Sequence, residues 1–387
     1  MEENATFRKA TPMSKTNSAR IEDYFQDLTD SRRGEVTYPL INIVVIAVCA
    51  VICGADDFVA IARFGNTKRD WLAKFLDLST GVPSHDRFNA IFAALNPVEF
   101  QQCLLSWITA LHGLTDGQII AIDGKTLRRS FDASSSKAAI HMVSAWATTN
   151  QISLGQVVVD AKSNEITAIP KLLELIEISG SLVKIDAIGC QTEIAKQIIE
   201  AGADYCLAAK ANQPTLFQEI DWHFVTHMEN DFADSPVRQF ETSEKGHGRI
   251  EMRYYYICPI PDGFSSASRW PGLKAIGAAI SNTERDGKMT CEVRYYILSN
   301  YLSARRFADA VRGHWGIENS LHWQLDVTFN EDQSRVRLGH ADANFSILRR
   351  TALGILKKEE TAKVGIKNKR LQAAWDDQYL EKLVSAA

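Results

Sequence analysis

The chain has 387 residues, 45% hydrophobic and 23% charged, a composition typical of a globular protein with a well-buried core. Its formal net charge of −4 excludes a general attraction to nucleic acid, so any such binding would need local clusters of basic residues. The seven cysteines include no C-x-x-C pair, which argues against a disulfide framework and against zinc held by paired cysteines.

The N-terminal region is predicted to be a short tail followed by helices. Residues 1–20 are polar and mixed in charge, which predicts a mobile tail and does not match a secretory signal. The apolar run 39–55 is shorter than the roughly 20 residues that cross a bilayer, so we expect a buried core helix. Helical periodicity continues to the end of an all-helical domain, 21–112. A plain packing module and helix–turn–helix DNA binding are both compatible with this domain.

A change of periodicity after Gly117 predicts an α/β unit. Strands are expected at 119–123, 140–147, 152–160, 182–187 and 204–208, with helices at 166–178 and 192–201. Three strands, a helix, a strand, a helix and a strand form the ribonuclease-H-like order, a mixed sheet flanked by helices. We therefore predict the first part of such a core over residues 113–212.

Residues 213–300 are predicted to be a β-rich insertion into this core. Strand-like runs at 251–257, 273–280 and 291–298 are separated by turn-rich connections. Helices are then expected at 303–325, 340–357 and 371–384. We assign 301–387 to the second part of the core and to C-terminal helices.

Three carboxylates stand in settings that suit a metal ion. Asp123 and Asp186 each follow an apolar strand, and Glu318 lies in the later helical pattern. Ligands gather at strand ends in open sheets, and Mg2+ prefers carboxylate oxygens. Two such ions, roughly 3.5–4 Å apart, can activate an attacking oxygen and stabilise a leaving one in phosphoryl transfer. The three acids therefore predict a site for two Mg2+ ions, replaceable by Mn2+, in an enzyme that cuts and joins nucleic acid.

Two of these acids, Asp123 and Glu318, have a rival interpretation. An aspartate before glycine, as at Asp123, is often a simple turn former. His314, Glu318 and His322 recur at four-residue steps, so they share a helix face that could bind zinc. However, histidines eight residues apart lie about 12 Å apart along a helix, too far to bind one ion without a break. A structural ladder on this face, with neighbouring tryptophans packed inward, is the other alternative.

Basic and polar residues near the acids are predicted to contact DNA phosphates. The candidates are Lys125, Arg128, Arg129, Lys210, Asn212, Arg249, His314 and Arg335. For those in loops, a solvated surface is the alternative interpretation.

Several stretches carry a resemblance to a known family. They are AIDGKTLRRS (121–130), VVVDAKSNEITAIPKLL (157–173), VKIDAIGCQTEIAKQI (183–198), AAKANQ (208–213), EKGHGRIEMR (244–253) and HWGIENSLHWQLDVTFNEDQSR (314–335). They resemble the DDE transposases of the H-repeat-associated insertion-sequence group (the ISAs family of bacterial elements). The helical part, with SRRGEVTYPL (31–40), resembles the transposase-associated N-terminal domain of that family. The likeness extends from about Ile21 to Arg350.

This resemblance implies a fold, an activity and partners. Asp123, Asp186 and Glu318 correspond to the catalytic acids of a ribonuclease-H-like core with an inserted β domain. The implied protein is a Mg2+-dependent transposase that binds double-stranded DNA, both the terminal inverted repeats of its element and the target. It is expected to act as a homo-oligomer in the bacterial cytoplasm, without a membrane partner. A structure-specific nuclease of the same fold and a decayed element product retained as a DNA-binding protein are the alternatives.

The chain departs from a wider signature of related transposases. These often place a tyrosine seven residues before the glutamate, an arginine four before it and a lysine seven after it. Here the three positions are Val311, His314 and Leu325. His314 is therefore expected to replace the phosphate-binding arginine.

Overall fold

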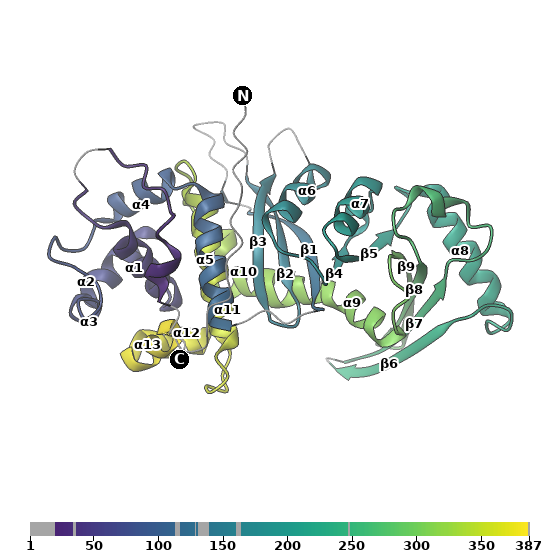
Figure 1. Cartoon of the computed structure of the whole chain (residues 1–387). Helices are drawn as coiled ribbons and strands as arrows, with labels where there is room; N and C mark the ends of the chain where they lie inside the picture. Colours follow the sequence, from purple (N-terminus) through teal and green to yellow (C-terminus); the bar gives the residue numbers. More distant parts are fainter. Residues whose placement is uncertain are drawn as a thin grey trace, which may run out of the picture.

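The structure is a computed structural model that describes residues 20–33, 36–112, 117–127, 129–130, 139–159, 164–246 and 248–385. The predicted tail therefore lies outside the described residues except for Arg20, and Arg128 lies outside them entirely. Figure 1 shows an elongated molecule with helices at one end and a long sheet that runs from the middle to the other end.

The N-terminal part is helical, as predicted. Its elements are η1 (Ile21–Tyr24), α1 (Leu40–Ile52), α2 (Phe58–Thr67), α3 (Arg69–Leu72), α4 (His85–Ala94) and α5 (Pro97–His112). Two helices begin at side-chain caps, because Asp57 accepts a hydrogen bond from the Ala60 amide and Ser84 one from the Arg87 amide. Helix α1 is buried along almost its whole length, which confirms the predicted core helix. Among the described residues, no helix is long and apolar enough to cross a membrane.

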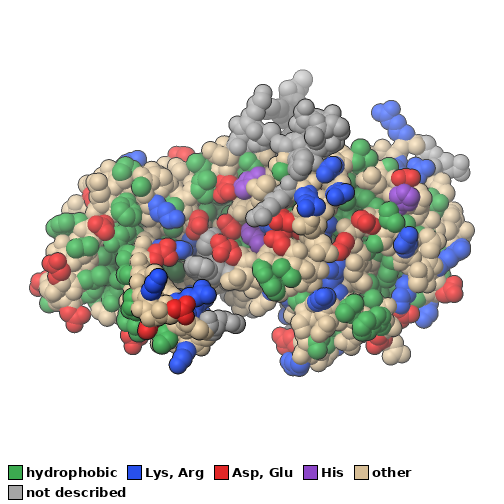
Figure 2. All heavy atoms as spheres, turned by 180° about the vertical axis from the view of Figure 1, so that it is seen from behind, with side chains coloured by type: hydrophobic (Ala, Val, Ile, Leu, Met, Phe, Trp, Pro, Cys, Tyr) green, Lys and Arg blue, Asp and Glu red, His purple; other side chains and the backbone are tan. Residues whose placement is uncertain are grey.

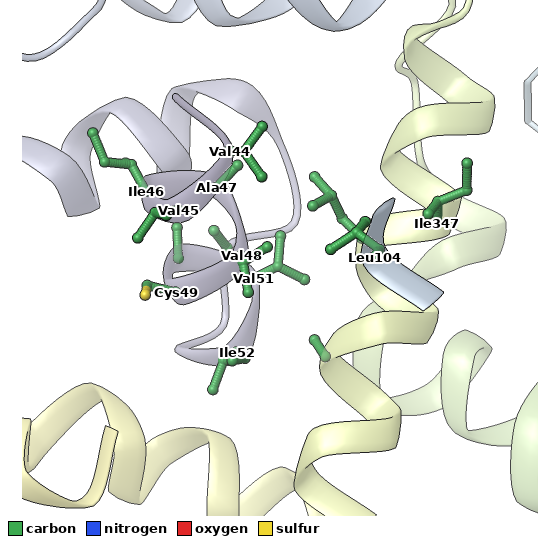
Figure 3. Close-up of a cluster of buried hydrophobic side chains, with 14 of the residues drawn as sticks. Val44, Val45, Ile46, Ala47, Val48, Cys49, Val51, Ile52, Leu104 and Ile347 are labelled. Atoms are coloured by element: carbon green, nitrogen blue, oxygen red, sulfur yellow. The ribbon is translucent and has the colours of Figure 1, made fainter. Parts of the chain in front are cut away.

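The N-terminal helices share one hydrophobic core with the C-terminal helices α11 (Ala341–Lys358), α12 (Ile366–Trp375) and α13 (Asp377–Ser385). Figure 3 shows the side chains of α1 beside Leu104 of α5 and Ile347 of α11. Segments from the two ends of the chain therefore form a single packed unit.

The central sheet has the predicted ribonuclease-H-like arrangement. Its strands are β1 (Ile119–Thr126), β2 (His141–Ala147), β3 (Ile152–Val159), β4 (Leu182–Ile185) and β5 (Asp204–Ala209). β1, β4 and β5 are parallel neighbours, and β2 and β3 add antiparallel strands beside β1. Helices α6 (Glu165–Leu175) and α7 (Thr192–Glu200) pack on one face. The predicted mixed sheet flanked by helices is confirmed.

The predicted β-rich region continues this sheet. Strands β6 (Arg238–Gly246), β7 (Arg249–Pro259), β8 (Ala275–Arg285) and β9 (Lys288–Leu298) follow one another as antiparallel neighbours, and β9 pairs with β5. The order in the described sheet is β3-β2-β1-β4-β5-β9-β8-β7-β6. Helix α8 (Pro214–Glu229), which was not predicted, packs on the same face as α6 and α7. We call the outer halves of β6–β9 the β extension.

The predicted helix at 303–325 consists of three parts. They are α9 (Ala304–Gly316), the π-helical turn η4 (Ile317–His322) and α10 (Trp323–Phe329). α9 packs on the sheet face opposite α6 and α7. Ile317, Leu321, Leu325 and Phe329 then enter the hydrophobic core that the N-terminal and C-terminal helices share. The helical unit therefore buries the apolar side of the segment that carries Glu318.

Candidate functional site

Asp123 and Asp186 lie beside each other on neighbouring parallel strands. The β1–β4 pairing ends at Ile122 opposite Ile185; Asp123 is the next residue of β1, and Asp186 is the first residue after β4. Neighbouring strands are about 4.8 Å apart, so the two backbones are close at this point. The prediction that Asp123 ends its strand was wrong: β1 continues to Thr126, because it still pairs with β2, where Asp123 lies opposite Ser144.

Strand alternation places both aspartates on the α9 face of the sheet. Residues two apart in a strand point to the same side. Ile119 on β1 and Leu182 on β4 pack against α9, so Asp123 and Asp186 are directed to that side. Their side chains are 20% and 42% exposed, respectively. The sheet thus presents two accessible carboxylates toward the segment that contains Glu318.

The π-helical turn η4 brings this segment to Asp123. His322, its last residue, has Nδ1 3.5 Å from Asp123 Oδ2, and η4 packs against β1. Glu318 lies four residues earlier in the same widened turn, on the same side as His322, and is exposed. The three predicted acids are therefore carried by β1, by the end of β4 and by η4, and both β4 and η4 contact β1.

Polar groups around Asp186 fix the end of β4. The Lys184 ammonium lies 3.4 Å from Asp186 Oδ1, above the Tyr296 ring, and its side chain is almost fully buried. The Asn212 side chain donates a 2.7 Å hydrogen bond to the Ala187 carbonyl, the first residue of the 3-10 turn η2 (Ala187–Gly189). Asn212, predicted to bind DNA, thus braces the loop that follows Asp186.

Lys125 lies in a buried ion cluster rather than in an open groove. Its ammonium contacts Asp326 of α10 and lies 3.2 Å from Glu331 Oε2, and its side chain is only 9% exposed. Glu331 also accepts hydrogen bonds from Arg350 and Ser346 of α11. Burial raises the pKa of Glu331, but Arg350 and Lys125 outweigh this effect and lower it to about 2. The cluster ties β1 to the segment after Glu318.

The remaining predicted residues are distributed over several surfaces. Arg129 and Lys210 are exposed in loops after β1 and β5. Arg249, half-exposed at the start of β7, lies 2.6 Å from Glu251. Arg335 is exposed and lines a separate cavity of about 570 Å³ with residues of α2 and α4. The side chain of His314 lies outside the described residues, as does Arg128.

Sequence reasoning missed several residues of the site. Lys184 stands two positions before Asp186, and strand alternation could have placed it on the same face. Arg253, Arg294 and Arg312 line a groove beside η4; strand pairing places Arg253 and Arg294 on one face, and Arg312 comes from α9. His322 was noted for its spacing, but its contact with Asp123 depends on how η4 packs on β1.

The donor chemistry of this site fits a hard divalent cation. Asp123 and Asp186 supply carboxylate oxygens, the ligands that Mg2+ and Mn2+ prefer. Within the described ranges, no group of three or more histidine, cysteine, aspartate or glutamate side chains is arranged so that it could hold a metal ion. The two aspartates are therefore adjacent without a third ligand already in place.

The sheet order and the paired aspartates define a ribonuclease-H-like protein. The family description "DDE_Tnp_1-associated" matches residues 22–108, and "Transposase DDE domain" matches residues 113–355. "Putative transposase YncI" of Escherichia coli O157:H7 is 40% identical over 369 residues, 94% of each chain. "H repeat-associated putative transposase YhhI" of Escherichia coli K12 is 39% identical over 361 residues, 91% of this chain and 94% of that one. The chain belongs to the DDE transposase family, whose members generally use divalent metal ions.

Proposed function

We propose that this transposase cuts DNA strands at the ends of an insertion sequence and joins them to target DNA. Asp123, Asp186 and Glu318 are its catalytic acids in this proposal. One observation carries it: two aspartates face the same side of neighbouring strands, and the turn that bears Glu318 packs against one of those strands.

In this proposal the three acids hold two divalent cations, Mg2+ or Mn2+. Such ions, when bound, polarise phosphate oxygens and lower the pKa of an attacking water. His322 and Lys184 keep the carboxylates of Asp123 and Asp186 directed to the reacting side. Groups held in place before the substrate arrives lower the cost of reorganisation during the reaction.

The proposed substrate is double-stranded DNA, comprising the terminal inverted repeats of the element and a target. The exposed residues Arg129, Lys210, Arg249 and Arg335 supply phosphate contacts, with Arg128 and His314 as further candidates. A homo-oligomer assembled on DNA in the bacterial cytoplasm would bring two element ends together.

The test uses the full chain and fragments selected for binding from a pool of genomic DNA. We expect Mg2+- or Mn2+-dependent cleavage of these fragments and joining of their ends to a plasmid. Asp123→Asn, Asp186→Asn and Glu318→Gln should each abolish cleavage and leave binding intact, whereas Glu193→Gln, at an exposed position on α7, should change neither. Near-normal cleavage by any of the three acid variants would refute its assignment.

The same assay separates the alternatives. Cleavage without joining would favour a structure-specific nuclease of the same fold. Binding without cleavage under either cation would favour a decayed element product retained as a DNA-binding protein.

A further inference from the structure

The β extension has two chemically different faces. Strand pairing aligns Arg249 with Arg285 and Arg285 with Lys288, so these three cations form a row across its tip. Along each strand, every second residue from this row toward the rest of the sheet lies on the same side, which we call the arginine face. Its charged members on the strands are Arg249, Arg253, Arg285, Lys288, Arg294, Glu244, Glu251 and Glu292.

The opposite face differs in composition. Lys245, Ile250, Glu284 and Met289 form the adjacent row across the same strands, where one cation and one acid accompany two apolar side chains. Cationic excess is therefore confined to one side of the extension. This asymmetry occurs in a chain whose formal net charge is −4.

The arginine face forms one wall of a groove of about 400 Å³ beside α9 and η4. Arg312 of α9 and Asn319 of η4 line the other side, and Asn319 is the residue next to Glu318. Burial lowers the pKa of Arg294, but its hydrogen bond with Glu292 and nearby negative charges, including Asp186, raise it overall. The groove therefore extends to the turn that bears Glu318. Figure 2, a view from behind, shows Lys and Arg side chains low on the left half of the molecule and Asp and Glu side chains toward its middle.

The charges of this face cost the isolated protein stability. Cations directly opposite each other on paired strands repel and destabilise the pairing. Glutamates offset part of this: Glu244 lies 2.6 Å from Arg312 and 3.2 Å from Arg253, and Glu292 lies 2.9 Å from Arg294. Exposed ion pairs contribute little to stability, so a phosphate can replace the carboxylates at little cost. Arginine also binds phosphate in a bidentate manner.

The length of the face suits several nucleotides. Lys288 and Arg294 are six residues apart on β9, which is about 20 Å of extended strand. One strand of a duplex carries a phosphate about every 3.4 Å along the axis, so this distance covers about six phosphates. From this geometry we infer that the arginine face binds the phosphate backbone of DNA and leads it to the turn that bears Glu318. The inference rests on the proposed function, because it assigns a path to the same substrate.

The test measures DNA binding by the full chain across a salt series. The probe is a fluorescein-labelled 30-base-pair duplex of random sequence, so the result does not depend on knowledge of the element ends. The double variant Arg285→Ala/Lys288→Ala removes two cations from the tip, where Arg285 is 72% exposed, so folding is not at risk. We expect the magnitude of the log-affinity versus log-salt slope to fall by about 1.8.

Two further variants make the test specific. Lys245→Ala removes a cation from the opposite face of the same extension and should leave the slope unchanged. Glu292→Gln removes an acid that competes for Arg294 and should tighten binding, by up to about fivefold, the factor for an exposed ion pair. Equal slopes for wild type and the double variant, or an equal loss from Lys245→Ala, would overturn the assignment of this face. A wild-type chain that fails to bind the duplex at low salt would instead overturn the proposed function itself.

Discussion

Replacement of Glu331 with glutamine should destabilise the protein by about 3–5 kcal/mol at neutral pH. Glu331 is buried between Lys125 of β1 and Arg350 of α11, both cations with little access to water. Removal of one member of a buried ion cluster leaves the other charges uncompensated, which accounts for losses of this size. Glutamine has nearly the same volume as glutamate and keeps one oxygen that accepts hydrogen bonds. The change in stability therefore reports the loss of the negative charge.

The acid sensitivity of the fold gives a second measure of the same cluster. A carboxyl group with a lower pKa in the folded chain contributes stability that is complete above its unfolded pKa and is lost as pH falls. For Glu331, the difference between 4.5 and about 2 corresponds to about 3 kcal/mol. This contribution should disappear between about pH 4.5 and pH 2. The Glu331→Gln variant should lack that part of the acid dependence.

Urea unfolding followed by tryptophan fluorescence measures both effects through the midpoint and slope of the transition. Glu360→Gln serves as the matched control, because Glu360 is exposed after the end of α11 and should change stability by less than about 0.5 kcal/mol. A Glu331→Gln variant within about 1 kcal/mol of wild type at pH 7, with the same acid dependence, would refute the reasoning.

Two other substitutions test how the site is built. Gly277→Ala should lower the free energy of unfolding in urea by about 1–3 kcal/mol, because its Cβ would lie 2.6 Å from Phe307 Cζ where α9 packs on β8. Gly246→Ala is the control, because a Cβ at Gly246 meets no atom within 4 Å. Equal stability of the two variants would contradict this packing. Lys125→Met should slow cleavage but leave the salt slope of DNA binding unchanged, because the Lys125 ammonium is paired with Asp326 and Glu331. A slope smaller in magnitude by about 0.9 would show instead that Lys125 contacts a phosphate.

The sequence was most informative where the relevant signal is local. Apolar strands followed by Asp123 and Asp186 could be recognised without a structure, and parallel crossover connections make such strands neighbours. Helix α8 also had a local signal that was overlooked: Pro214 at its start and Leu216 and Ile220 at four-residue spacing on its buried side.

Other features depend on contacts between distant parts of the chain. β9 pairs with β5 across some ninety residues, so the extension could be predicted as β-rich but not as a continuation of the sheet. The partners of Lys125 lie 201 and 206 positions away in sequence, which explains why its surroundings could not be inferred from the adjacent arginines. The π-helical turn differs from an α-helix by a shift of hydrogen bonds, and the 3.6-residue pattern carries no sign of that shift.

The common core of the N-terminal helices and the segment that carries Glu318 has a consequence for how such genes change. Ile317, Leu321 and Leu325 share a core with residues 21–112 and with the C-terminal helices, so a deletion of 21–112 would expose apolar surface of that core. The boundary between the two family descriptions, near residue 110, therefore does not separate two hydrophobic cores. Recombination that exchanges the N-terminal part of the gene has to preserve this shared core.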